Sequence, residues 1–253
     1  MKKVKFGAVL KHIIDRLELL LKGGFIKKDL KIYNALNTRE NFKYNKEKKF
    51  FIWKDKYAQA GSCCSYLFQD LWAAKLIYKN NPKKHFDIGS RIDGLITHIL
   101  TFKDEVTLID IRPFETKIPG VKFIQSDATN LDVIEDNSIE SISALCSLEH
   151  FGLGRYGDPI NPEACFMAFK AIQKKLKPGG YAYISIPIGK ERLEFNAHRI
   201  FYAKTILEEF NEMELIEFST TDGNSIEYNP PVDKYDSNND RWDIFGLFCF
   251  RKK

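Results

Sequence analysis

A short strand that stops at a glycine turn constrains the fold of this 253-residue chain more than any other feature. Residues 85–91 have the sequence HFDIGSR, an apolar strand followed by a tight turn. Gly89 lets the backbone turn there and approach a ligand closely, because glycine has no Cβ. The next segment, residues 92–100, has a helical pattern, and a helix start offers free N–H groups. This order predicts the first strand, turn and helix of a ligand-binding α/β sheet.

Strand and helix patterns alternate along the chain. Helices are expected at about 64–79, 92–100, 162–176 and 203–210, and strands at 85–88, 106–111, 121–125, 139–145, 181–187, 213–220 and 243–251. Such alternation implies βαβ units with right-handed crossovers and a parallel sheet. The last two strands follow each other, so the final strand returns antiparallel. The sequence therefore predicts an α/β, Rossmann-like fold with a seven-stranded, mostly parallel sheet and an antiparallel last strand.

Composition is that of a soluble globular protein, with 44% hydrophobic and 29% charged residues. The net charge of +5 is modest and no clear basic groove is visible, which argues against a nucleic-acid partner. Five cysteines with no CxxC pair indicate free thiols in a reducing cytoplasm and no structural zinc. The sequence has no run of about 18 apolar residues, so no transmembrane segment is expected.

Two domains are expected, a helical cap over residues 1–60 and the main domain over residues 61–253. Apolar residues between Phe6 and Leu21 recur at helical spacing, and Gly23-Gly24 ends the pattern. This amphipathic helix is interpreted as a segment that packs on the core or on a second copy of the chain, which would make a homo-oligomer. Flanking lysines also suit a membrane surface.

An acidic residue, Asp110, ends the second strand about 20 residues after the glycine turn. A carboxylate there can accept hydrogen bonds from both hydroxyls of a ribose. Further along, Asp127 follows the third strand, and Leu176-Lys177-Pro178-Gly179-Gly180 ends a helix before the fifth.

Taken in this order, Asp87-Ile88-Gly89, Asp110, Asp127 and the segment 176–180 resemble the class I S-adenosylmethionine-dependent methyltransferases. The resemblance implies S-adenosyl-L-methionine as cofactor and S-adenosyl-L-homocysteine as product. The chain has Arg91 and Asp93 where the family usually carries glycines, and the missing GxGxxG pattern disfavours NAD. The implied cofactor-binding residues are Asp87, Gly89, Ser90, Arg91, Asp110, Ile111, Ser126, Asp127, Ala128, Leu145 and Cys146.

The segment 147–159, SLEHFGLGRYGDP, follows the fourth strand at the active edge of the sheet and is dense in polar, aromatic and glycine residues. It resembles a poorly characterised bacterial group of methyltransferase-like proteins associated with surface-polysaccharide synthesis, over roughly residues 60–210. That resemblance implies methylation of a sugar hydroxyl, on a nucleotide-activated sugar such as a GDP-heptose, in capsule or lipopolysaccharide biosynthesis.

A hydroxyl acceptor requires a base. His150 is the first candidate because its unperturbed pKa lies near 6.5, and His198 and Asp158 are the alternatives. Asp158 also suits a helix cap. Glu149 would orient His150 only if the backbone bends, since neighbours in a strand face opposite ways.

Two further residues of this segment are expected to bind the substrate. Arg155 suits a phosphate or carboxylate, and Tyr156 suits stacking on a sugar or base. No metal site is predicted, because the spacing of Glu149, His150 and Asp158 is not diagnostic of a divalent ion.

Two alternative functions stay open at this point. One is methylation of another small molecule or of an amine, which needs less base catalysis. The other is a non-catalytic cofactor-binding or membrane-surface partner in a polysaccharide assembly complex. Asn229-Pro230-Pro231 is interpreted as a loop, because the similar motif of DNA amino-methylation follows the fourth strand.

Overall fold

The computed structural model describes residues 24–253 except 49, 57, 59 and 62, and the chain divides into two compact units at residue 62. The amphipathic helix predicted between Phe6 and Leu21 lies outside the described residues. The first unit contains α2 (Gly24–Leu36) and the short turns η1 (Glu40–Phe42) and η2 (Lys46–Lys48), none with a buried residue. Its role as a cap stays a prediction.

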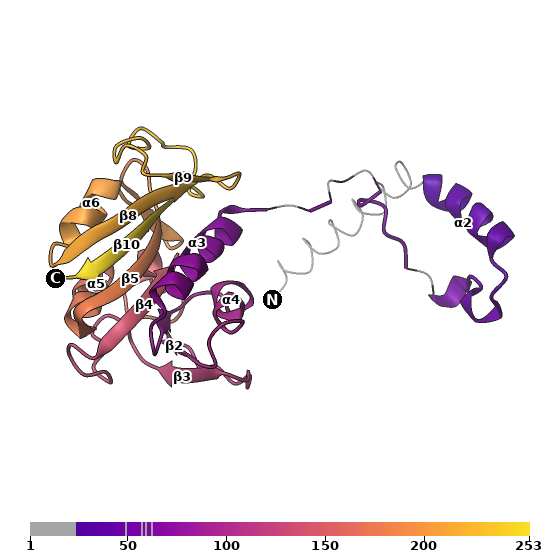
Figure 1. Cartoon of the computed structure of the whole chain (residues 1–253). Helices are drawn as coiled ribbons and strands as arrows, with labels where there is room; N and C mark the ends of the chain where they lie inside the picture. The colour runs from indigo at the N-terminus through magenta and orange to yellow at the C-terminus, as the bar shows by residue number, and fades with distance from the viewer. Residues whose placement is uncertain (1–23, 49, 57, 59, 62) are drawn as a thin grey trace. The chain divides into compact units, whose positions relative to one another are not determined.

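The second unit, Cys63–Lys253, is built on an eight-stranded sheet with the strand order β3-β2-β1-β4-β5-β10-β8-β9 (Figure 1). The strands of this sheet are β1 (Phe86–Ile88), β2 (Val106–Asp110), β3 (Val121–Gln125), β4 (Ile139–Leu145), β5 (Leu176–Pro187), β8 (Met213–Thr221), β9 (Ile226–Tyr228) and β10 (Phe245–Lys252). Strands β1 to β5 pair in parallel, and β10 runs antiparallel to both β5 and β8. The predicted fold class is confirmed, and the short edge strand β9 is one strand more than expected.

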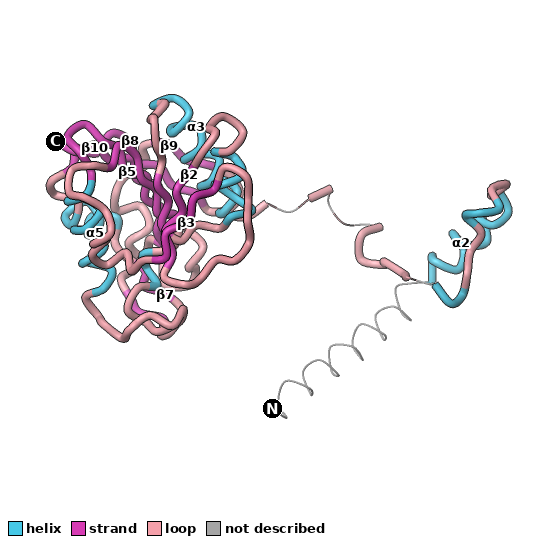
Figure 2. The backbone as a smooth tube through the Cα atoms, turned by 90° about the horizontal axis from the view of Figure 1, so that it is seen from below, coloured by secondary structure: helices cyan, strands magenta, loops and turns pink. Residues whose placement is uncertain are grey.

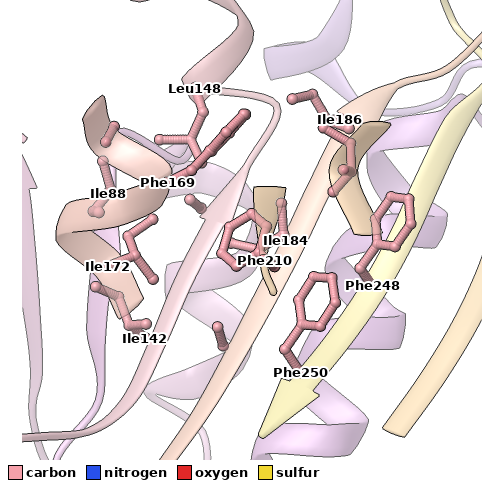
Figure 3. Packing of buried hydrophobic residues seen from close by; sticks show 14 of the residues in the cluster. Ile88, Ile142, Leu148, Phe169, Ile172, Ile184, Ile186, Phe210, Phe248 and Phe250 are labelled. Atoms are coloured by element: carbon pink, nitrogen blue, oxygen red, sulfur yellow. The ribbon is translucent and has the colours of Figure 1, made fainter. Parts of the chain in front are cut away.

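Helices cover both faces of the sheet, which forms the central layer in Figure 2. The helices are α3 (Ser65–Asn80), η3 (Ile92–Ile96), α4 (Thr97–Ile99), α5 (Ala164–Lys175) and α6 (Ala203–Glu209). Alternate residues of β5 face opposite cores: Ile184 packs with α5 and α6, and Tyr183 packs with α3 and α4. Figure 3 shows the first of these cores, in which Phe169 and Phe210 lie against the sheet. Each fully buried aromatic side chain of this kind contributes about 1.5–3 kcal/mol.

Two elements differ from the sequence prediction by more than two residues. The helix expected at 92–100 is broken, because Gly94, inside η3, has non-helical φ and ψ of −114° and −111°. Strand β5 begins at Leu176 rather than Tyr181, since Leu176 already pairs with Ile139 before a bulge. Gly179, with φ of +79°, turns within this irregular start instead of just past the helix end.

A two-stranded antiparallel hairpin, β6 (Arg192–Glu194) and β7 (His198–Ile200), follows β5. It leaves the sheet at the carboxyl end of β5, so its residues reach the edge where α/β proteins bind ligands. Among the described residues, no helix is both long enough and apolar enough to cross a membrane.

Candidate functional site

Two cavities meet at the carboxyl edge of the parallel strands, with volumes of about 960 Å³ and about 190 Å³. They share a common wall. The residues that line both cavities are Gly89, Asp110, Arg112, Cys146, His150 and Tyr156. A combined site of this size, where strand order reverses between β1 and β4, is the usual ligand position in an open α/β sheet.

The turn after β1 brings the backbone against the end of β4. Gly89 has φ of +65°, and its N–H donates to the carbonyl of Ile109 at 3.0 Å. A Cβ on Gly89 would lie 3.1 Å from the Cβ of Ser147, a contact tighter than nine in ten seen in proteins. Glycine is therefore favoured here by the dihedral angle, and the close neighbour adds to that preference.

A buried polar network supports this turn from behind. The Asp87 carboxylate accepts hydrogen bonds from the Ser90 hydroxyl (2.8 Å), the Ser90 N–H (3.1 Å) and the Ser143 hydroxyl. Ser143 in turn lies 2.9 Å from Nε2 of His85. Burial raises the pKa of Asp87 to about 6 and lowers that of His85 to about 3. Unlike the other predicted cofactor-binding residues, Asp87 lines neither cavity, so its place in the fold is that of a support for the Gly89 turn.

At the end of β2, the Asp110 carboxylate holds the side chain of Arg112. Oδ1 accepts from the backbone N–H (2.8 Å) and Nε (2.9 Å) of Arg112, and Oδ2 accepts from Nη2 (2.7 Å). The guanidinium carbon of Arg112 also lies 4.5 Å from the ring centre of Tyr156. Arg112 was missed by the sequence analysis, although its position two residues after Asp110 was visible.

The smaller cavity extends from Asp110 along the ends of β2 and β3. The predicted residues Ile111, Ser126, Asp127 and Ala128 all line it. Asp127 orders its own loop, because Oδ1 accepts the N–H of Thr129 at 2.8 Å. The Ser147 hydroxyl is buried there and has no hydrogen-bond partner, so a bound group in this cavity would meet an unsatisfied donor and acceptor.

The larger cavity is bounded by Ser90, Arg91 and Leu145, as predicted, and by two residues of α3, Tyr66 and Gln69. Gln69 Oε1 accepts from the Ser185 hydroxyl at 2.6 Å and from Cys146 Sγ at 3.2 Å. Burial raises the pKa of the Cys146 thiol, so it stays protonated. Tyr66 and Gln69 lie three residues apart on the helix that enters β1, and this spacing on one face was the available signal.

After β4 the backbone bends into the short turn η4 (Leu148–His150), which satisfies the condition set for Glu149. Glu149 Oε1 lies 3.5 Å from His150 Nε2. The side chain is only 2% exposed, and its Oε2 has no hydrogen-bond partner. Burial raises the pKa of Glu149 to about 8, so the carboxyl group is protonated at neutral pH. It lines the larger cavity as a neutral acid with one free oxygen.

The imidazole of His150 is fixed in one tautomer. Its Nδ1 lies 2.6 Å from the carbonyl oxygen of Ala197 and therefore donates its proton there, which leaves the lone pair on Nε2. Burial lowers the pKa of His150 to about 4, and the Arg155 charge acts in the same direction. His150 is consequently neutral and able to accept a proton at neutral pH.

His198, from β7, lies beside it with a ring-centre separation of 6.3 Å. Its Nε2 is 3.1 Å from Glu194 Oε2, although the angles are not those of a hydrogen bond. Burial lowers the pKa of His198 as well. The ring of Trp242, another residue that the sequence analysis missed, lies 5.6 Å from His198 at the wall of the larger cavity.

Asp158 lines the smaller cavity but its carboxylate is occupied by backbone donors. Oδ2 accepts the N–H groups of Gly152 (2.7 Å) and Gly154 (3.2 Å), and Oδ1 accepts that of Tyr156 (3.1 Å). Burial acts to raise the pKa of Asp158, but these hydrogen bonds together lower it. In this arrangement Asp158 holds the loop that carries Arg155 and Tyr156. The described part of the chain contains no group of three His, Cys, Asp or Glu side chains placed to hold a metal ion.

Solved structures with the same fold include a methyltransferase. The 1,6-didemethyltoxoflavin-N1-methyltransferase of Burkholderia thailandensis, crystallised with 1,6-didemethyltoxoflavin and S-adenosylhomocysteine, has a TM-score of 0.50 and 17% identity, over 73% of this chain and 78% of that chain. The [4+2]-cyclase SpnF has a TM-score of 0.48 and 16% identity, over 71% of this chain and 81% of that chain. The N-methyltransferase NodS from Bradyrhizobium japonicum WM9, in complex with S-adenosylhomocysteine, has a TM-score of 0.43 and 14% identity, over 67% of this chain and 77% of that chain.

The likeness to the first of these structures, together with the strand order, defines the fold as the Rossmann-like fold of class I methyltransferases. Residues 94–241, more than half of the chain, match the family described as Caenorhabditis protein of unknown function, DUF268, and the chain belongs to this family. No curated protein matches the sequence.

Proposed function

We propose that this protein is an S-adenosylmethionine-dependent methyltransferase that methylates a hydroxyl group of a small polar acceptor. One observation carries the proposal: the Gly89 turn and the Asp110 carboxylate lie at the ends of adjacent parallel strands and line both cavities at their junction. A glycine turn and a carboxylate so placed suit a ligand with a ribose between two other groups.

The residues around this junction fit the cofactor. Asp110 would accept from the ribose hydroxyls, and Oδ2 retains a lone pair because it accepts only one hydrogen bond. Ser126, Asp127 and Ala128 would contact the adenine in the smaller cavity, and the unpartnered Ser147 hydroxyl would gain a partner nearby. Gly89, Ser90 and Leu145 would lie along the methionine part at the larger cavity.

When bound, the cofactor supplies a methyl group activated by a sulfonium centre. In this proposal His150 is the base. Because Ala197 holds its Nδ1 proton, Nε2 keeps a lone pair and would take the proton of the acceptor hydroxyl. A base with a pKa of about 4 suffices because the acceptor oxygen becomes strongly acidic as it gains the methyl group.

The acceptor we propose is a sugar, activated as a nucleotide sugar such as a GDP-heptose. The larger cavity, at about 960 Å³, has room for such a molecule, and polar groups from Glu149, Arg155 and Tyr156 line it. The setting in capsule or lipopolysaccharide biosynthesis is supported by the resemblance of residues 147–159 alone. Incubation with a panel of nucleotide sugars and S-adenosylmethionine, followed by mass spectrometry, tests the class: a mass gain of one methylene group on one member is expected.

The cofactor is tested by calorimetric titration of S-adenosylhomocysteine into the purified protein and its Asp110→Ala variant. Saturable binding at one site is expected, with an affinity at least 100-fold lower in the variant. Asp104→Ala is the matched control, because Asp104 is an exposed carboxylate before the opposite end of β2. A folded wild-type protein that does not bind, or an Asp110→Ala variant that binds equally well, would overturn the proposal.

A further inference from the structure

Two guanidinium groups converge on one aromatic ring inside the larger cavity. The guanidinium carbon of Arg112 lies 4.5 Å from the ring centre of Tyr156, and that of Arg155 lies 5.1 Å from it. Both distances allow cation–π attraction, which holds each side chain at the cavity wall. Arg112 comes from the end of β2 and Arg155 from the loop after β4, so the fold brings them together from separate segments.

The two charges are not balanced in the same way. Arg112 is paired with Asp110 through three hydrogen bonds. Arg155 donates to the carbonyl of Ala197 at 3.0 Å, and no carboxylate of the described residues forms an ion pair with it. An oxyanion beside Arg155 would supply the negative partner that this guanidinium lacks. The unbalanced cation therefore favours an anionic ligand.

Asp110 is engaged by Arg112 at the place where the ribose of a cofactor would bind. Its Oδ1 already accepts two hydrogen bonds and its Oδ2 one. One acceptor site of this carboxylate is free, so two ribose hydroxyls that donate to it would displace one side-chain donor of Arg112. The contact with Tyr156 would keep the loosened guanidinium at the cavity, with that N–H group free to bind a ligand.

We propose that Arg112 and Arg155 together bind an oxyanion of the acceptor, a phosphate or a carboxylate, and that cofactor binding at Asp110 releases Arg112 to bind it. The inference rests on the proposed function and adds to it a substrate class and an order of binding. The cofactor binds first, and the acceptor follows. By thermodynamic linkage, the oxyanion must also tighten cofactor binding by the same factor.

Calorimetry with two probes tests this, using inorganic pyrophosphate for the phosphate class and malonate for the carboxylate class. Each probe is titrated into the full-length protein without S-adenosylhomocysteine and again with it at saturation. We expect one of the two probes to bind at least tenfold more tightly in the saturated protein. The probe that does so identifies the acceptor's charged group.

Three variants separate the parts of the inference. Arg155→Gln should lose probe binding by at least tenfold and keep the affinity for S-adenosylhomocysteine. In Arg112→Gln, S-adenosylhomocysteine should no longer increase the affinity for the probe. This variant should bind S-adenosylhomocysteine at least as tightly as the wild type, because the arginine that competes for Asp110 is gone. Asp110→Asn should bind the probe tightly without S-adenosylhomocysteine, because Arg112 loses its carboxylate partner.

The matched control is Arg251→Gln, which removes an exposed arginine near the last residue of β10, at the opposite edge of the sheet. It should change neither titration. Probe affinity that is the same in Arg155→Gln and in the wild type, or unchanged by S-adenosylhomocysteine, would overturn the inference while cofactor binding upholds the proposed function. If S-adenosylhomocysteine does not bind at all, the proposed function fails, and Asp110→Asn still decides whether Arg112 and Arg155 bind an oxyanion.

Discussion

Gly89 and Ser147 lie close together: a Cβ on Gly89 would lie 3.1 Å from the Cβ of Ser147. A side chain at position 89 would therefore force the turn after β1 or the end of β4 to shift by a few tenths of an ångström. This contact lies at the junction of the two cavities, since Gly89 lines both and Ser147 lines the smaller one. The shape of the proposed cofactor site therefore depends on the absence of a Cβ at position 89.

Gly89→Ala is expected to destabilise the protein by about 2 kcal/mol, because the left-handed backbone alone costs an L-residue about 1–2 kcal/mol and the Ser147 contact adds to it. The same change should weaken S-adenosylhomocysteine binding at least tenfold, since the turn must shift away from β4. Denaturant unfolding and calorimetry measure the two effects.

Gly157→Ala is the matched control for this change. Gly157 also has a left-handed backbone, with φ of +81°, but a Cβ there would meet no atom within 4 Å. It should lose stability by about 1 kcal/mol and keep its affinity for S-adenosylhomocysteine. Equal effects of the two substitutions on binding would show that the contact with Ser147 does not shape the site.

Some elements of this fold could be predicted from the sequence because local sequence patterns mark where they begin and end. The strands over 121–125 and 139–145 occupy the predicted residues, since each is an apolar or alternating run between turns. The start of β5 was not predictable in this way. Lys177-Pro178-Gly179-Gly180 has turn composition, yet Leu176 is drawn into the sheet by its pairing with Ile139, a contact that only the tertiary structure supplies.

In the candidate site, too, some residues could be predicted from the sequence and others depend on the tertiary structure. Parallel strands place their carboxyl ends at one edge, so Asp110 and the segment after β4 were expected to converge, and they line common cavities. Tyr66 and Trp242 could not be assigned, because they reach the cavity from α3 and from the loop before β10. Asp87 begins the Asp87-Ile88-Gly89 motif in the sequence, but in the structure it lines neither cavity. It accepts hydrogen bonds from Ser90 and Ser143, which support the Gly89 turn.

Glu149→Gln tests whether the buried carboxyl group is neutral. The pKa of Glu149 is raised to about 8 in the folded protein, so the native state holds a proton that the unfolded chain releases above about 4.5. The associated stability is complete at pH 4.5 and is lost as the pH rises through about 8. The amide needs no proton, so the stability difference between variant and wild type should grow in favour of the variant by on the order of 4 kcal/mol between pH 5 and pH 9.

Thermal or denaturant unfolding at several pH values measures this difference. Glu135→Gln is the control, because it makes the same exchange at an exposed position in the loop before β4, away from the buried site. A difference for Glu149→Gln that stays flat from pH 5 to pH 9 would mean that the carboxylate is already ionised in the native protein.

His150→Ala should lower kcat for a hydroxyl acceptor by about 10²–10⁴-fold, the usual contribution of a positioned base. His198→Ala should lower it far less, because the Nε2 of His198 lies 3.1 Å from the Glu194 carboxylate. Because the pKa of His150 is lowered to about 4, we expect the wild-type rate to be constant through neutral pH and to fall only as the pH drops toward 4. Steady-state kinetics of both variants against pH provide the measurement. Near-normal rates in both would instead indicate an amine acceptor, which needs less base catalysis.

Asp158→Asn separates a structural role for Asp158 from that of a base. The carboxylate accepts three backbone N–H groups, and an asparagine offers only one oxygen, so one or two of these hydrogen bonds are lost. Each such loss costs about 1 kcal/mol, and the loop that carries Arg155 and Tyr156 becomes less ordered. The KM for the acceptor should therefore rise severalfold while kcat and its pH dependence stay close to those of the wild type. A hundredfold fall in kcat, with loss of the wild-type pH profile and an unchanged unfolding midpoint, would instead assign proton transfer to Asp158.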